Sequence, residues 1–299
     1  RVELASSPSE QAVYLQKALV DIKNASRYSD KKGDFWYNQA KLIYGVVSVD
    51  STLADPAWTI ETAMEALDKA IGEDDQPACH QLRADILFNK GEFQQAFDEY
   101  MIVNNSDIAS SSSYYLAAKA KEQVTGFNIG DVIDLLDKAI EKCGTNMNVE
   151  AAAYVLERID WRLRLAQYTE AVADYDLYYR LLGGQVLPNF FFLREQAKFR
   201  AGDLEGALKD IQTAILGSSD TPDYYAEEAS IYVRMQKYPD ALKSIEKAIA
   251  IAPDFGACYR LRGVCYVRLE KKAEACEAFN KAKELGDPLA EKLIKEHCK

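Results

Sequence analysis

The stretch GACYRLRGVCYVRLEKKAEACEAFNKAKELGDP, at Gly256–Pro288, decides the fold because its pattern also occurs earlier in the chain. The stretch before it, PDYYAEEASIYVRMQKYPDALKSIEKAIAIAPDF at Pro222–Phe255, has residues of similar size at the same places. Two sets of residues keep a spacing of 34: Ala207, Ala241 and Ala275, and Phe191, Tyr225 and Tyr259. A fixed period of this length is typical of a solenoid, in which one supersecondary unit is repeated along the chain.

The residue sizes within each unit are those that two helices packed side by side require. Counted from the first residue of a unit, positions 8 and 20 hold small residues: Ala229, Gly263, Ala241 and Ala275. Positions 4, 11 and 24 hold larger ones: Tyr225, Tyr259, Tyr232, Tyr266, Ile245 and Phe279. We therefore expect the two helices to approach most closely at positions 8 and 20. A proline follows each second helix, because proline cannot continue it.

These units resemble the tetratricopeptide repeat (TPR), a helix–turn–helix unit of 34 residues. The resemblance implies an all-α fold, an α-solenoid wound as a right-handed superhelix. Weaker copies of the pattern extend back through GEFQQAFDEY at Gly91–Tyr100 to a helix near Asp34–Val47 and its partner near Pro56–Ile71. We count about seven TPR-like helix pairs in all.

A repeat array needs a cap at each end, because the outermost pair otherwise leaves an apolar face in water. We expect an N-terminal segment and capping helix in residues 1–33, with the helix near Pro8–Asn24. The repeat array follows in residues 34–285, and a C-terminal capping helix in residues 286–299. The apolar stripe of that last helix contains Leu289, Leu293 and Ile294.

Three stretches depart from the simple pattern. Glu195 stands where a small residue is expected, which indicates a register shifted by one or two residues. A helix cannot bury the three consecutive rings of Phe190–Phe192 on one face, so we expect Phe192 to face the groove or a neighbouring unit; local repacking in a shifted register is the alternative. Ser110–Ser113 has the composition of a helix start.

Composition excludes several classes of protein. The chain has 47 acidic and 36 basic residues and a net charge of −11, without a basic stripe, which argues against nucleic acid as a partner. No run of 18 or more apolar residues occurs, so the sequence predicts no transmembrane segment.

The six cysteines do not form a recognisable metal site. There is no C-x-x-C pair and there are only two histidines, so we predict no zinc site and no cofactor. Cys258 and Cys265 are separated by roughly 10 Å along one helix, which is too far for a disulfide. We therefore interpret the cysteines as reduced, small apolar residues.

Two features of the sequence give opposite indications of the cellular compartment in which the protein is located. Reduced cysteines favour a reducing compartment. The first residue is Arg1 and the polar start RVELASSPSE suits the region after a signal peptide. The ending ELGDPLAEKLIKEHCK is similar in style to exported TPR proteins of gut-type anaerobic bacteria. We slightly favour an exported, periplasmic or cell-envelope location over the cytoplasm.

No catalytic signature is present. The sequence has no nucleophile elbow, phosphate-binding loop, zinc-protease motif or dinucleotide-binding fingerprint. His80 is the one realistic histidine for acid–base chemistry, but it falls at position 4 of its unit, a packing position. We interpret His80 as a core histidine with satisfied hydrogen bonds and predict that the protein is not an enzyme.

A column of arginines is the best candidate for a binding site. Arg200, Arg234 and Arg268 recur at intervals of 34, and Arg164 lies 36 before Arg200, all at position 13 of a first helix. The TPR resemblance implies that first helices line a concave groove, chiefly through positions 2, 5, 9, 12 and 13. The candidate groove residues are Arg164, Phe192, Gln196, Phe199, Arg200, Arg234, Arg260 and Arg268.

Such a groove suits an extended peptide that carries carboxylates, because the arginine fork matches a carboxylate. A structural alternative stands beside it: cations are favoured near a helix C-terminus, and each arginine could pair with a nearby acid. The Lys and Asn clamp that TPR proteins use for chaperone tails is not reproduced, since those positions hold residues such as Ala226, Ser230 and Leu261.

The leading hypothesis is a non-catalytic scaffold or adaptor that binds a protein or peptide in the concave TPR groove. The alternative is a structural or assembly subunit of a bacterial cell-envelope complex, which would expose an apolar patch outside the groove. A lectin-like or accessory role would need an acidic and aromatic pocket, which the sequence does not locate.

Overall fold

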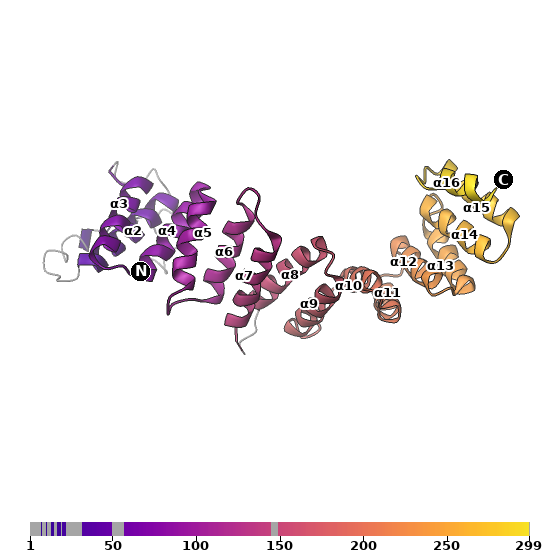
Figure 1. Cartoon of the computed structure of the whole chain (residues 1–299), viewed down its shortest axis with the longest axis horizontal. Helices are drawn as coiled ribbons and strands as arrows, with labels where there is room; N and C mark the ends of the chain where they lie inside the picture. Colours follow the sequence, from indigo (N-terminus) through magenta and orange to yellow (C-terminus); the bar gives the residue numbers. More distant parts are fainter. Residues whose placement is uncertain are drawn as a thin grey trace. The chain divides into compact units, whose positions relative to one another are not determined.

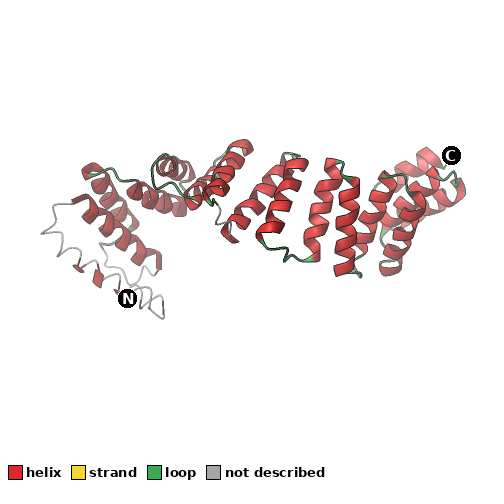
Figure 2. Cartoon of the chain, turned by 90° about the horizontal axis from the view of Figure 1, so that it is seen from below, coloured by secondary structure: helices red, strands yellow, loops and turns green. Residues whose placement is uncertain are grey.

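The computed structural model describes residues 32–49, 57–144 and 149–298, together with isolated positions between residues 7 and 21. The regular elements in these ranges are α-helices, which Figure 2 shows joined by loops. Their bounds are α2 Lys32–Val49, α3 Ile60–Glu73, α4 Pro77–Lys90, α5 Phe93–Asn104, α6 Ser111–Glu122, α7 Ile129–Lys142, α8 Val149–Arg164, α9 Tyr168–Leu181, α10 Pro188–Ala201, α11 Leu204–Gly217, α12 Pro222–Arg234, α13 Tyr238–Ile251, α14 Gly256–Arg268, α15 Lys272–Glu284 and α16 Ala290–His297.

The helices pack as successive pairs within two compact units, residues 1–154 and 155–299 (Figure 1). In the first unit, α2 packs against α3, α4 against α5 and α6 against α7. In the second unit, α10 packs against α11, α12 against α13 and α14 against α15, while the Arg158–Asp174 ion pair joins α8 to α9. The predicted all-α solenoid of about seven helix pairs is confirmed.

The core follows the predicted small positions. Ala207, Ala241 and Ala275 are buried, as are the alanines seven residues further along each second helix. A Cβ atom placed on Gly263 would lie 2.4 Å from the ring of Phe279, well inside van der Waals contact. Position 8 of the last pair is therefore glycine because the partner helix leaves no space for a side chain.

Two helix starts have reciprocal caps. The Thr59 and Thr62 side chains each accept a hydrogen bond from the other's backbone N–H, and Ser110 and Ser113 do the same. These caps satisfy backbone donors that the first turn leaves free. The expected start at Ser110–Ser113 is confirmed, whereas the second helix begins at Ile60 rather than near Pro56.

The C-terminal helix α16 packs against α15. Ala290 is buried and Leu293 and Ile294 are half-buried, but Leu289 is 52% exposed and does not complete the predicted stripe. The predicted N-terminal helix near Pro8–Asn24 lies outside the described residues, apart from isolated positions.

The interpretation of all six cysteines as reduced is wrong for two of them. Cys276 on α15 and Cys298 after α16 form a disulfide, with Cα atoms 5.6 Å apart. The return of α16 along α15 brings the two together across 22 residues, and no sequence spacing reveals that return. Cys79, Cys258 and Cys265 are free and buried, and Cys143 is free and half-buried.

We expect the disulfide to hold α16 in place. It closes a loop of 22 residues, for which the loss of unfolded-state entropy stabilises the folded state by about 3 kcal/mol. The Cys298→Ser variant should therefore unfold its C-terminal pair at lower urea concentration, and dithiothreitol should do the same to the wild type. Cys143→Ser is the control and should match the wild type. Equal urea midpoints for the oxidised and reduced wild-type protein would contradict this role.

Candidate functional site

A pocket of about 500 Å³ lies in the second unit, on the first helices of three successive pairs. Phe199 comes from α10, Val233 and Arg234 from α12, and Val264 and Arg268 from α14. The rest of the lining consists of Ser230, Gln236, Tyr238 and Leu261. The pocket therefore has an apolar floor and two guanidinium groups in its wall.

The repeat places these side chains together. Ser230, Val233 and Arg234 are at positions 9, 12 and 13 of their unit, so they are spaced i, i+3 and i+4 on one helix face. Val264 and Arg268 hold positions 9 and 13 of the next unit. Gln236 comes from the turn between α12 and α13 and Tyr238 is the first residue of α13, and the groove positions of the sequence pattern include neither.

Arg234 and Arg268 differ from the other arginines of the column. Both are exposed, and neither makes an ion pair, hydrogen bond or ring contact with another described residue. The structural alternative, in which each arginine pairs with a nearby acid, therefore does not describe these two side chains.

The other candidate arginines already have partners. Arg164 forms an ion pair with Asp160 at 2.8 Å and lies over the ring of Trp161. Arg260 forms an ion pair with Asp287 at 2.9 Å. These contacts hold both side chains away from the pocket lining.

Arg200 is also engaged. Its guanidinium donates to the Tyr168 hydroxyl at 3.4 Å and lies over that ring. Burial and Asp223 raise the pKa of Glu227, and Arg200 acts in the opposite direction, which places its charge near that carboxyl. The charge of Arg200 is therefore partly balanced within the chain.

The predicted aromatic and amide candidates divide in the same way. Phe199 lines the pocket, whereas the Phe192 ring packs on Tyr224 of α12 at 5.1 Å and Gln196 is half-buried outside the lining. Phe190 packs against tyrosines of α9, and Phe191 lies in the core between α10 and α11. Phe190 and Phe191 therefore share Tyr179 of α9 as a neighbour, whereas Phe192 packs on α12 of the next pair.

Glu195 occupies the small-residue position of its unit without a shift in register. Its side chain is 0% exposed, and neither carboxyl oxygen has a hydrogen-bond partner. Burial, with repulsion from Glu227 and Asp210, raises the pKa of Glu195 to about 8. Glu195 is therefore a neutral acid at pH 7, and the register shift inferred from it was wrong.

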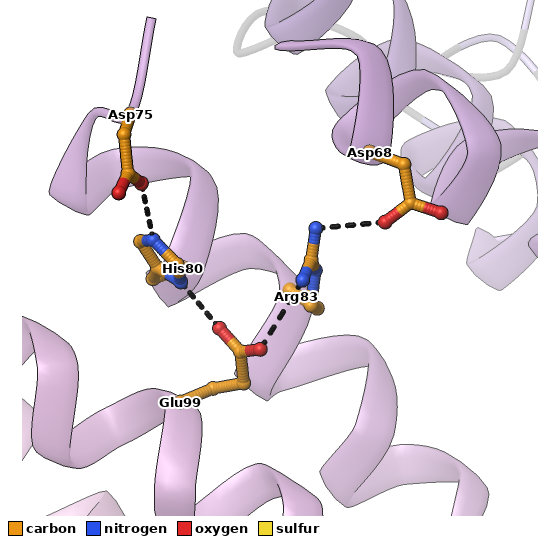
Figure 3. Close-up of polar contacts among 5 residues, drawn as sticks. All are labelled: Asp68, Asp75, His80, Arg83 and Glu99. Carbon is orange, nitrogen blue, oxygen red and sulfur yellow. Dashed lines mark hydrogen bonds and ion pairs between the residues drawn. The ribbon is translucent and has the colours of Figure 1, made fainter. Parts of the chain in front are cut away.

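Charged side chains at position 7 tie consecutive pairs together. Arg83 on α4 contacts Asp68 of α3 at 2.8 Å and Glu99 of α5 at 3.3 Å (Figure 3). The ring of His80 lies between Glu99, at 2.5 Å from Nδ1, and Asp75, at 2.6 Å from Nε2. We call these five residues the α3–α5 clasp.

Two similar clasps occur in the second unit. Arg194 on α10 contacts Asp176 of α9 at 2.9 Å and Asp210 of α11 at 2.7 Å. Glu228 on α12 has the opposite charge and accepts hydrogen bonds from Gln212 of α11 and Ser244 of α13. Each clasp satisfies polar groups that are buried where three helices meet.

The α3–α5 clasp also settles the position of His80. The side chain is buried, with 7% of the residue exposed, and each ring nitrogen lies within hydrogen-bond distance of a carboxylate oxygen. This is the satisfied core histidine that the sequence predicts. In the described parts of the chain, no cluster of three or more His, Cys, Asp or Glu side chains is arranged to hold a metal ion. None of the described helices has the length and apolar character to span a membrane.

Comparison with known proteins agrees with this architecture. Residues 226–290, which contain most of the pocket, match the tetratricopeptide repeat family. None of the curated proteins compared with the sequence matched it significantly. The C-terminal part of a TPR repeat-containing protein from Cytophaga hutchinsonii is similar in structure, with a TM-score of 0.50 and 15% identity over 69% of this chain and 79% of that chain.

Two further solved structures share less of the arrangement. YrrB, described as a TPR protein with an unusual peptide-binding site, gives a TM-score of 0.41 at 16% identity, over 77% of this chain and 98% of that chain. The TPR2AB domain of yeast Sti1, in a complex with pHSP90, gives 0.40 at 15% identity, over 88% of this chain and 94% of that chain. At these identities the likeness concerns the fold alone.

We expect Glu195→Gln to change how stability depends on pH. The folded pKa of about 8 lies above the unfolded value of about 4.3, so between these pH values the folded state holds a proton that unfolding releases. The contribution of Glu195 to stability is therefore lost as pH rises, by about 1.4 kcal/mol per pH unit in that window. In urea unfolding from pH 5 to pH 9, the free energy of unfolding of the variant should rise relative to that of the wild type as the pH increases. For the control Glu277→Gln, which changes an exposed residue, the curve of stability against pH should run parallel to that of the wild type. A parallel curve for Glu195→Gln would refute the raised pKa of Glu195.

We expect Glu99→Gln to destabilise the first unit by about 2 kcal/mol, because it removes the carboxylate shared by half-buried Arg83 and buried His80 and leaves Arg83 with Asp68 alone. The measurement is the urea midpoint of the first unit, followed by hydrogen exchange of α3–α5. Glu65→Gln removes an exposed charge from α3 and should leave that midpoint unchanged. A Glu99→Gln midpoint equal to that control would show that the clasp does not stabilise the unit.

Proposed function

We propose that this chain, a tetratricopeptide-repeat protein, is a non-catalytic scaffold that binds an acidic peptide segment in the pocket of α10, α12 and α14. The observation that carries the proposal is the pair Arg234 and Arg268, two exposed guanidinium groups beside an apolar floor with no partner among the described residues. In a chain with a net charge of −11, acids to pair with them are abundant. Their separation from those acids supports a role in binding an external anion.

The chemistry of the pocket favours a peptide carboxylate. A guanidinium donates two parallel hydrogen bonds to a carboxylate, and such charge-assisted bonds are stronger than neutral ones. Phe199, Val233 and Val264 supply apolar area against which a peptide side chain is desolvated. Small sites with an apolar lining and a few placed polar groups are the usual form of a binding pocket.

The absence of catalysis is part of the proposal. The hydrogen-bond partners of His80 are carboxylates on both sides, and its ring is buried, so it has no access to a substrate. The raised pKa of Glu195 belongs to a side chain that is 0% exposed, and Glu195 does not line the pocket. Both groups are explained by packing.

A second candidate function is that of a structural subunit, which binds a constitutive partner outside the pocket. Leu187 and Leu216 are 78% and 87% exposed, and they flank Pro188 and Gly217, whose atoms approach closely. This apolar pair is of the kind that an assembly surface would cover. The Cys276–Cys298 disulfide supports an exported or periplasmic location for either function, because disulfides persist in oxidising compartments.

The test is a binding measurement on a panel of short acidic peptides and their Asn and Gln counterparts. We expect acidic peptides to bind the wild type and the Arg234→Glu/Arg268→Glu variant to bind them at least about tenfold more weakly, because both carboxylate contacts are reversed in sign. Arg180→Glu on α9 makes the same type of substitution once, at an exposed arginine away from the pocket, and should bind like the wild type. If the double variant binds as tightly as the wild type, the binding site lies outside this pocket.

A further inference from the structure

We infer that the pocket recognises two carboxylates three residues apart, at i and i+3 of an extended peptide, with an apolar side chain between them. This inference rests on the proposed function and specifies the partner of the same site. It follows from the repeat geometry, which places two unpaired arginines at equivalent positions of neighbouring helices.

The number of carboxylates follows from which arginines are available. Arg234 and Arg268 are exposed and unpaired among the described residues. The next member of the column, Arg200, is engaged by Tyr168 and lies near Glu227. A third carboxylate reaching toward Arg200 would therefore meet a partly balanced charge. Two acids make full use of the column, and a third in the same register adds nothing.

The spacing of the acids follows from the spacing of the helices. Arg234 and Arg268 are both at position 13 of their units, so one helix-to-helix step of about 8–10 Å relates them where α12 packs beside α14. A polyproline II segment rises about 3.1 Å per residue with three residues per turn, so residues i and i+3 lie on one edge about 9 Å apart. In a β-strand, residues i and i+2 share a face but are only about 7 Å apart. The i, i+3 spacing fits the two arginines best.

The apolar floor fixes what lies between the acids. A polyproline II segment has three edges, so one edge can face the arginines while the next faces the floor. That floor is formed by Phe199, Val233, Leu261 and Val264, with Tyr238 at its margin. Aromatic and aliphatic walls of this kind accept a leucine or phenylalanine side chain. The recognised segment therefore reads acid, apolar, any residue, acid.

The measurement is fluorescence anisotropy with nine-residue peptides that are acetylated and amidated, so that terminal charges do not contribute. Each peptide has two glutamates separated by two to five positions, with one phenylalanine directly after the first glutamate. A set with a single glutamate gives the baseline. We expect affinity to be highest at i, i+3, by about tenfold over both the i, i+2 and i, i+5 peptides and the single-glutamate set.

Two variants keep the inference testable apart from the proposed function. Arg268→Ala should abolish the dependence on spacing and bind every two-glutamate peptide like a single-glutamate one, whereas Arg180→Ala should retain the wild-type profile. Circular dichroism confirms that both are folded. Equal binding at all spacings, still dependent on Arg234 and Arg268, would overturn the spacing inference while the proposed function stands. If no acidic peptide binds the wild-type protein, both are refuted.

Discussion

The rest of the structure depends on the close approach of the two helices within each pair. At Gly263 the partner ring of Phe279 leaves no space even for a methyl group, and Ala84 and Ala229, at the equivalent places of two other pairs, are fully buried. This contact sets the distance and rotation of one helix against the other. Because the same contact recurs at a fixed spacing, position 13 of each first helix emerges on the same face. The arginine pair of the pocket is thus a consequence of backbone packing.

The contacts between one pair and the next are made differently, through buried charge. In the α3–α5 clasp, and around Arg194 and Glu228, one side chain reaches second helices on both sides. A buried ion pair adds little net stability over apolar packing, but a buried charge without its partner is costly. Only the native register of the helices therefore satisfies these charges. We infer that the clasps fix how pairs stack within a unit. Glu195 is the opposite case, a buried acid without a partner that stays neutral.

The sequence was sufficient for the helix pairs and their core. The spacing of 34 predicted the pairs and the buried alanines, and of the eight candidate groove residues Phe199, Arg234 and Arg268 line the pocket. The sequence was not sufficient for contacts between residues that the repeat does not relate to each other. The Cys276–Cys298 disulfide depends on how α16 returns along α15, and the partner of each arginine depends on which of many acids lies within reach. A regular spacing of 16 between Arg83 and Glu99, and again between Arg194 and Asp210, would have revealed the clasps.

The two arginines of the pocket have no partner among the described residues, unlike most arginines of the described chain. Arg158, Arg194 and Arg260 are held by buried carboxylates, and Arg164 by an exposed one. With 47 acids in the chain, few of the described guanidinium groups lack a partner, and two that do, Arg234 and Arg268, stand one repeat apart beside the same apolar floor. An exposed ion pair contributes little to stability, so pairing these two arginines would have gained the fold little. Leaving them unpaired keeps two hydrogen-bonding forks available to a ligand, at a separation that the helix packing fixes in advance. A peptide with matching carboxylates would meet a preorganised site.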